Sequence, residues 1–391
     1  MRREGCRRMD VAPLHRSAQR RPDPNSAAPT SCTRPVQRPT QPGHPCLPAA
    51  LSLCCVEDQT MAQPGGVAET TREALASMDP TSRAPQRLEF GIWMPPLPSW
   101  PVLRQRAHLV ESLGFDSLWM VDHFANPYAT DTTWMESWTL LAALACCTQR
   151  VRIGSLVTNI IYRHPAVIAK SALSLDHISA GRLVLGLGAG YAGDPSHAMT
   201  GVTPWPPAER VDRLEEIVAI VDSMLRQSET SYRGRYYQVE GAIMKPPPIQ
   251  QPRPQLLIAA QGRRTLQLAA RFADHWCTMG DMHSSARDVV QATREMNQAL
   301  TNEARSLGRD PDRIARAFCV GWTQERPFDS LSSFEDYLGP LIEAGITQFM
   351  FGFWEVDDVG RPAPIRHIPS AKVLEWLAGV AIPSLRSWMA A

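Results

Sequence analysis

The chain has 391 residues, is 44% hydrophobic and carries a formal net charge of +1, so it can bury a large core in one barrel or in two or three smaller domains. Its near-neutral charge gives no electrostatic reason to expect a nucleic-acid or membrane-surface partner. No apolar run reaches the roughly 18 residues that a membrane span needs, so we expect no membrane helix.

Residues 1–87 differ in composition from the rest of the chain. They are rich in Pro, Arg, Ser and Gln, and large apolar residues are rare among them. Such a segment buries too little apolar surface to offset its chain entropy, so we expect a disordered, low-complexity extension. A transit peptide and a translation start at Met61 or Met78 are the alternatives. The folded domain is then predicted to span residues 88–391.

Strand-like and helix-like segments alternate regularly from Leu88 onward. Short, almost continuously apolar runs are typical of parallel strands that are buried on both faces. Eight strand–helix pairs in one domain predict a single α/β (β/α)8 TIM barrel, and a doubly wound open sheet is the alternative. The predicted strands lie within residues 88–94, 116–121, 151–158, 182–188, 255–260, 275–279, 314–322 and 347–354.

The fourth predicted strand ends in a glycine-rich stretch, RLVLGLGAGYAGD, at residues 182–194. Gly188, Gly190 and Gly193 spell G-x-G-x-x-G, but a dinucleotide fingerprint must lead directly into a helix. The proline-rich continuation DPSHAMTGVTPWPPAER predicts that no helix starts before about Ala208. We therefore expect a long loop whose glycines let the backbone approach a flat ligand.

Cysteine and lysine usage excludes several kinds of chemistry. Cys146, Cys147, Cys277 and Cys319 lie in apolar stretches, where we expect free core thiols of a cytoplasmic protein. No Cys/His cluster has metal-ligand spacing, so we predict no metal site. The chain has three lysines, at positions 170, 245 and 372, and none falls at a strand end, where a Schiff-base enzyme of this fold would need one.

In a TIM barrel the functional residues follow the C-terminal ends of the strands. These positions are poor in lysine and carboxylates, which suits a planar aromatic cofactor that supplies the chemistry itself. They include Asp122, His123, Phe124, Thr158, Asn159, Gly188, Gly190, Tyr191, Gln261, Gly262, Trp354 and Glu355.

Four stretches carry a resemblance to a known family: FDSLWMVDHF (115–124), ESWTLLAALA (136–145), the block at 151–191 and RFADHWCT (271–278). Over about residues 88–280 the chain resembles the bacterial luciferase-like family of flavin- and deazaflavin-dependent oxidoreductases. The resemblance implies a (β/α)8 barrel that binds coenzyme F420, with FMN as the alternative. The form of the 151–191 block favours the F420-type branch.

The resemblance also implies roles for individual residues. His123 matches a histidine that faces the cofactor ring, either as a proton-transfer group or as a residue that only orients its loop. The bond Leu156–Val157 matches a non-prolyl cis peptide that supports the ring, and Thr158 and Asn159 follow it. Tyr191 stands where some relatives have an acid, so it is expected to act as a proton donor or as a stacking aromatic.

The stretch AAQGRRT at 259–265 resembles the family's phosphate-binding loop. Backbone N–H groups at a helix start attract anions, and Arg263 or Arg264 would add charge unless both are simply solvated. The predicted catalytic residues are thus His123 and Tyr191, and the predicted cofactor-binding residues are His123, Leu156, Val157, Thr158, Asn159, Gly188, Gly190, Tyr191, Ala260, Gln261, Gly262 and Arg263.

The loop after the fourth strand departs from the family pattern. Relatives commonly carry an acid beside the histidine, but here Ser196 precedes His197, with an apparent one-residue insertion. Glu136 lies at a helix start, where capping explains it as well as proton chemistry does.

The leading functional prediction is hydride transfer between F420 and a small organic substrate. The first alternative is an FMN-dependent monooxygenase that takes reduced flavin from a separate reductase. The second is a non-catalytic flavin-binding protein. A separate F420 reductase and a homodimer are further partners that the resemblance leaves open.

Overall fold

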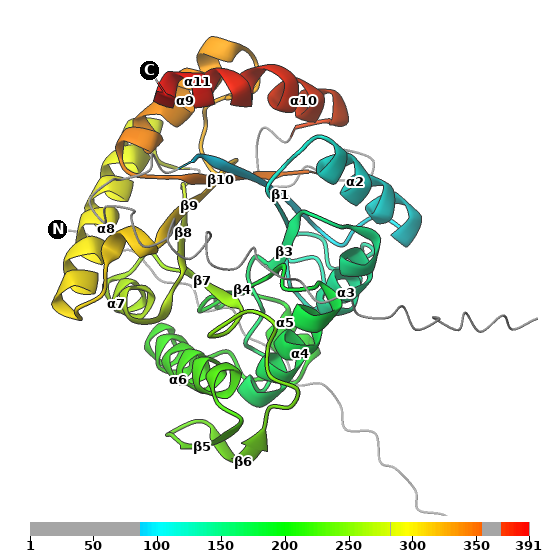
Figure 1. Ribbon diagram of the computed structural model, residues 1–391, viewed down its shortest axis with the longest axis vertical. Helices are drawn as coiled ribbons and strands as arrows, with labels where there is room; N and C mark the ends of the chain where they lie inside the picture. The colour runs from blue at the N-terminus through cyan, green and yellow to red at the C-terminus, as the bar shows by residue number, and fades with distance from the viewer. Residues whose placement is uncertain (1–86, 282, 354–368, 391) are drawn as a thin grey trace, which may run out of the picture. The chain divides into compact units, whose positions relative to one another are not determined.

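The computed structural model describes residues 87–281, 283–353 and 369–390. Within them, eight parallel strands close into a barrel in the order β1-β10-β9-β8-β7-β4-β3-β2, with helices outside it (Figure 1). The predicted TIM barrel is therefore confirmed over the open sheet. The expected disordered extension, apart from residue 87, lies outside the described residues, as do Trp354 and Glu355.

Each barrel strand is short and almost wholly buried. The register is parallel throughout, with Phe90 opposite Phe349 and Leu118 opposite Ile153 as examples. Burial on both faces explains why these runs are continuously apolar rather than alternating. The strands are β1 (Glu89–Met94), β2 (Ser117–Met120), β3 (Arg152–Ser155), β4 (Leu183–Leu187), β7 (Gln255–Ala259), β8 (His275–Met279), β9 (Ala315–Cys319) and β10 (Gln348–Gly352).

The outer helices begin and end where the sequence supplies boundary residues. The helix at 165–178, for example, starts with Pro165, whose fixed φ suits a first helical position. The helices are α2 (Trp100–Ser112), α3 (Ser137–Cys147), α4 (Pro165–Ile178), α6 (Pro207–Arg226), α7 (Arg263–Phe272), α8 (Ala286–Ser306), α9 (Leu331–Glu343), α10 (Ala371–Trp376) and α11 (Ile382–Ala390), with a 3-10 turn at Pro311–Arg313 and a π-helical turn at Leu377–Ala381. No helix in the described part of the chain is both long and apolar enough to cross a membrane.

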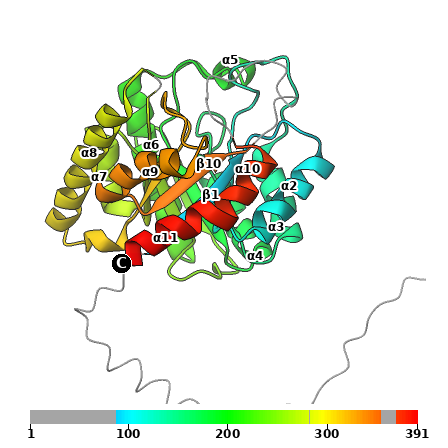
Figure 2. The same cartoon turned by 90° about the horizontal axis from the view of Figure 1, so that it is seen from above.

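Two insertions interrupt the strand–helix alternation. An antiparallel hairpin of β5 (Glu229–Arg233) and β6 (Gln238–Ile243) separates α6 from β7. The loop after β4 contains a one-turn helix, α5 (Ser196–Met199), which lies at the end of the barrel that is uppermost in Figure 2. The expectation of no helix before Ala208 was wrong for this turn, because Pro195 precedes its first residue and so removes no interior hydrogen bond.

The core has two parts. The larger packs the strands against the helices, and the smaller fills the inside of the barrel with Trp93, Trp119, Val184, Leu257, Cys277, Ala317, Cys319 and Met350. Cys277 and Cys319 are buried free thiols, as predicted, whereas Cys146 is exposed. The sequence did not predict that Cys146 is exposed, because the apolar sequence of α3 does not show which side of the helix faces solvent.

Candidate active site

A cavity of about 420 Å³ lies at the C-terminal ends of the barrel strands, within the range of about 300–1,000 Å³ that is usual for small-molecule sites. Gly262 and Arg263 are not among the residues that line it; they form the start of α7 beside it. Loops from four strands bring the other predicted cofactor residues together in its wall: His123, Leu156, Val157, Thr158, Asn159, Gly188, Gly190, Tyr191, Ala260 and Gln261.

The wall after β3 is formed by the bond Leu156–Val157, which is cis as the resemblance implied. The chain then returns to the barrel, where the Thr158 N–H donates to the Gly186 carbonyl at 2.9 Å. A Cβ on Gly188 would lie 2.7 Å from a Val157 methyl group. Gly188 is therefore required by close packing against Val157, a reason that the glycine pattern did not reveal.

Gly190 is a glycine for a different reason. Its φ is +63°, and no atom lies within 4 Å of the position that a Cβ would take. The positive φ favours glycine, while the absence of a side chain leaves this part of the rim open. In this loop, close packing thus requires a glycine at position 188, and the backbone conformation favours one at position 190.

His123 is held by a carboxylate that the sequence did not single out. Its Nδ1 lies 2.8 Å from Asp194 Oδ2, and the Trp134 indole N–H donates to the His123 carbonyl at 2.7 Å. The His123 side chain is 25% exposed, whereas that of Asp194 is buried. A buried acid therefore fixes one ring nitrogen of a histidine that also lines the cavity.

Asp194 is itself fixed by its own loop and by the loop after β3. It accepts hydrogen bonds from Asn159 Nδ2 at 3.0 Å and from the Ser196 N–H at 2.8 Å. The Ser196 hydroxyl in turn accepts from the Phe124 N–H at 3.0 Å. An acid therefore lies two residues before Ser196 in this loop, and its side chain contacts His123 and not His197.

The charge on Asp194 decides the protonation pattern of the histidine. Burial by itself raises the pKa of Asp194, but hydrogen bonds from His123 and Ser196 and the charge of His123 lower it below its ordinary value overall. An ionised carboxylate only accepts hydrogen bonds, so Nδ1 of His123 must carry the proton. Nε2 is then the ring nitrogen that can exchange a proton with a ligand.

Asp122, next to His123, has a structural role. Its buried carboxylate accepts from the Asn159 N–H at 2.9 Å, from the Tyr162 hydroxyl at 3.1 Å and from Arg163 at 2.9 and 3.1 Å. Arg163 also pairs with Glu136 at 2.6 Å. Asp122 thus ties the loop after β3 to the end of β2 and is not available as a free base.

Glu136 caps α3, which was one of the two predicted explanations for it. Its carboxylate accepts from the Trp138 N–H at 3.1 Å and from the Thr139 N–H at 2.6 Å. These bonds satisfy amides at the helix start that have no partner within the helix. Glu136 therefore stabilises the rim of the cavity in two ways, by capping α3 and by pairing with Arg163.

Tyr191 lies beside His123 at the mouth of the cavity. The two ring centroids are 6.4 Å apart in an edge-on arrangement. Burial, followed by the nearby Asp194 and Tyr128, raises the pKa of Tyr191 to about 12. Its hydroxyl therefore stays protonated at neutral pH and can donate a hydrogen bond.

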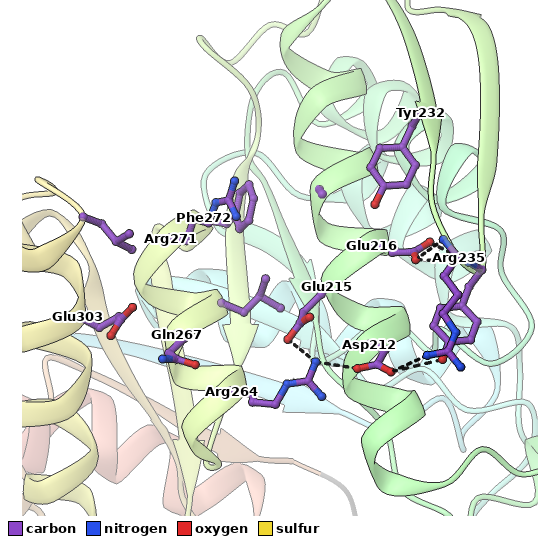
Figure 3. A pocket seen from close by; sticks show the side chains of 14 residues that line it. Asp212, Glu215, Glu216, Tyr232, Arg235, Arg264, Gln267, Arg271, Phe272 and Glu303 are labelled. Atoms are coloured by element: carbon purple, nitrogen blue, oxygen red, sulfur yellow. Dashed lines mark hydrogen bonds and ion pairs between the residues drawn. The ribbon is translucent and has the colours of Figure 1, made fainter.

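Arg263 and Arg264, the two arginines predicted to add charge at a phosphate site, differ in their ion-pair partners at the start of α7. Arg264 pairs with Asp212 at 2.7 Å and Glu215 at 2.8 Å, both on α6. Figure 3 shows this side chain among the residues of a second hollow, of about 770 Å³, that is lined by α6, α7, α8 and the β5–β6 hairpin. Arg263 is exposed and has no ion-pair partner in the described chain, so the two neighbouring arginines differ in their surroundings.

The described residues contain no group of three or more His, Cys, Asp or Glu side chains that could hold a metal ion. The sequence reasoning missed several other residues of the cavity wall. Trp93 lies within β1 near its C-terminal end and Trp322 follows β9, so their positions could have indicated them. Tyr128 lies within a loop and gave no such signal.

A closed parallel barrel with a cavity at its strand ends defines a TIM-barrel protein whose site lies on the rim where enzymes of this fold carry their active sites. The family model described as luciferase-like monooxygenase matches residues 76–326. The chain belongs to this luciferase-like family, as its sequence indicated.

Two relatives illustrate the similarity. The F420-dependent glucose-6-phosphate dehydrogenase of Microbacterium testaceum is 33% identical over 211 residues, which cover 53% of this chain and 59% of the relative. The 5,10-methylenetetrahydromethanopterin reductase of Archaeoglobus fulgidus is 27% identical over 284 residues, which cover 68% of this chain and 80% of the relative. The match to the first relative thus spans less than two thirds of that protein's length.

Solved structures agree on the fold. An F420-dependent secondary alcohol dehydrogenase in complex with an F420-acetone adduct superposes with a TM-score of 0.61 at 19% identity, covering 75% of this chain and 98% of that one. The long-chain alkane monooxygenase LadA also gives 0.61, at 15% identity, covering 77% and 92%. At these identities the likeness supports the barrel alone.

Proposed function

We propose that this protein transfers a hydride between coenzyme F420 and a small organic substrate, and that His123 exchanges the accompanying proton. The observation that carries this proposal is the His123–Asp194 pair in the wall of the rim cavity. It supplies an imidazole whose Nδ1–H is held by a buried carboxylate and whose Nε2 can exchange a proton. The F420-dependent relatives support the choice of cofactor.

The residues present fit a flat cofactor with a phosphate group. Leu156, Val157 and Gly190, which carry no polar side-chain atoms, form part of the cavity wall. At the neighbouring helix start, the Gly262 N–H donates to Thr265 Oγ1 at 3.2 Å, so the Arg263 backbone N–H and the Arg263 side chain are the groups offered to an anion. The deazaflavin, when bound, supplies hydride acceptance and donation.

The protein's own contribution is to orient and to move the proton. Asp194 fixes the ring of His123 through Nδ1, as buried carboxylates do for general-base histidines in other enzymes. His123 Nε2 then takes the proton from a substrate hydroxyl or returns it to a carbonyl. Tyr191, which stays protonated, is placed to donate a hydrogen bond at the mouth of the same cavity.

Cofactor retention tests this function. Purified protein is incubated separately with F420 and with FMN, desalted, and examined by absorbance. We expect F420 to remain bound and FMN to be lost. Retention of FMN alone would favour a monooxygenase supplied by a separate reductase, and retention of neither would contradict a cofactor-dependent enzyme. Sedimentation of the same samples shows whether the protein forms the homodimer that the resemblance leaves open.

A further inference from the structure

The loop after β4 carries Asp194, and it is held by aromatic packing as well as by hydrogen bonds. We infer that Trp205 and His197 are positioning residues: by packing against each other they keep this loop folded so that Asp194 stays bound to His123. The inference rests on the proposed function of His123. It concerns different residues, since neither Trp205 nor His197 is among those that line the cavity.

His197 joins the backbone of this loop to the packing. Its N–H donates to the Asp194 carbonyl at 3.2 Å, and its own carbonyl accepts from the Val202 N–H at 2.9 Å. The residue is 1% exposed, and neither ring nitrogen has a hydrogen-bond partner among the described residues. Buried polar atoms usually have such partners, so packing contacts hold this imidazole in place.

Trp205 provides the aromatic contact of His197. The two rings are edge-on, with 5.9 Å between their centroids and 84° between their planes, an arrangement that aromatic pairs prefer. Arg213 Cζ, on α6, lies over the Trp205 ring at 4.3 Å from its centroid, which adds a cation–π attraction. Arg210 Nη1 also donates to the Trp205 carbonyl at 3.1 Å. Trp205 thus connects the loop after β4 to the first turns of α6.

The β5–β6 hairpin extends this packing. Arg213 Cζ also lies 4.3 Å from the ring centroid of Tyr236 and 5.8 Å from that of Tyr237, both in the turn of the hairpin. Glu216 of α6 fixes the turn by accepting from the N–H groups of Tyr236 at 3.1 Å and of Tyr237 at 3.0 Å. The insertion between α6 and β7 thus holds Arg213 against Trp205, and so supports the loop after β4.

The ring nitrogens of His123 report directly on this positioning. Because Asp194 accepts the Nδ1 proton, NMR of full-length, cofactor-free protein with nitrogen-labelled histidines should show the Nδ1–H tautomer of His123. The signals of His123 are identified by their loss in His123→Ala. Trp205→Ala should lose this tautomer, whereas Trp205→Phe, which keeps an aromatic ring beside His197, should retain it. Retention of the tautomer in Trp205→Ala, or its absence from the parent protein, would overturn the inference.

Trp376→Ala is the matched control for a general loss of stability. Trp376 also lies edge-on to a ring at 5.9 Å, that of Phe334, but it belongs to α10, which is across the barrel from α6 (Figure 1). This variant should keep the tautomer of His123 and the turnover per folded molecule. If it changed the tautomer as much as Trp205→Ala does, the effect would not come from the loop, and the inference would fall.

Turnover shows whether Trp205 acts through Asp194. At saturating F420, Trp205→Ala should lower kcat by about tenfold, within the usual cost of losing an orienting partner, and Trp205→Phe by clearly less. Combined with Asp194→Asn, Trp205→Ala should cause little further loss, because both changes remove the same contact. Losses that multiply in the double variant would overturn the inference.

His197→Leu separates packing from chemistry at that position. Burial lowers the pKa of His197 and Arg210 lowers it further, which outweighs the opposite effect of Asp194, so we expect an uncharged ring that leucine can replace. The variant should keep the tautomer of His123 and most of the parent kcat. A loss of turnover as large as that of His123→Ala, with the tautomer intact, would make His197 a proton-transfer residue and overturn the inference. Failure of the parent protein to bind F420 would refute the proposed function, whereas the tautomer measurements would still decide the inference.

Discussion

Two histidines at opposite ends of the barrel show what distinguishes a chemical from a structural imidazole. His275, at the start of β8, has Nδ1 2.9 Å from Gln348 Oε1 and Nε2 3.0 Å from Gln255 Oε1, and it is 3% exposed. His123, after β2, has one nitrogen bound to Asp194, and its ring lines a cavity. Both ring nitrogens of His275 are thus bound to neutral amides. His123 has one ring nitrogen bound to a carboxylate, and its other ring nitrogen is available to a ligand.

The largest expected effect concerns His123. His123→Ala should lower turnover by about 10²–10⁴-fold, because the matching proton transfer is lost. The fold should persist, since the side chain is partly exposed and its removal leaves the core intact. Steady-state assays at saturating F420, with cofactor binding measured separately, give the result. A fall of less than about threefold would make His123 a packing residue.

The second-largest loss of turnover is expected when Asp194, the carboxylate bound to His123, is changed. Asp194→Asn keeps the shape of the side chain but removes the charge, and we expect turnover to fall by about 10–100-fold, the usual cost of losing such an orienting partner. Unchanged turnover of Asp194→Asn at saturating F420 would reduce Asp194 to a loop-folding role.

The helix start at Gly262 should control affinity for the cofactor. Gly262→Asp places a carboxylate where the phosphate is expected, so F420 should bind at least about tenfold more weakly. Gly262→Ala is the matched control, because φ is −92° there and a Cβ would meet only Thr265 Oγ1, at 3.8 Å. Equal titration curves for the two variants would remove the phosphate from this loop.

The smallest effect on catalysis is expected at the opposite end of the barrel. His275→Asn should leave turnover per folded molecule unchanged but cost about 1–3 kcal/mol of stability, since Gln255 or Gln348 loses its partner. Chemical denaturation measures the loss. A fall in turnover comparable to that of His123→Ala would break the distinction between the two histidines.

Stability against pH gives a second signature of His275. Burial lowers its pKa in the folded protein, so the unfolded chain binds more protons once the pH falls below about 6.5. Stability should therefore be full above that pH and decline as the pH falls. We expect His275→Asn to show a smaller decline between pH 7 and 5 than the parent protein; an identical decline would show that His275 does not contribute.

Local patterns were sufficient for the fold but only partly for the site. Apolar runs with breaks located the barrel strands, and the family resemblance located His123 and the cis bond at Leu156–Val157. The contact between His123 and Asp194 depends on how the loop after β4 folds back over β2, which no spacing in the sequence encodes. Likewise, Arg263 and Arg264 differ only because α6 presents Asp212 and Glu215 to one of them.

Chemical rescue tests most directly whether His123 exchanges the substrate proton. His123→Gly creates space at the cavity wall, and added imidazole can then replace the missing ring beside Asp194. With F420 bound, we predict that imidazole restores turnover by at least about tenfold, and that this restoration follows the fraction of neutral imidazole. A variant that retains F420 and its fold but gains nothing from imidazole would contradict the assignment of proton exchange to His123.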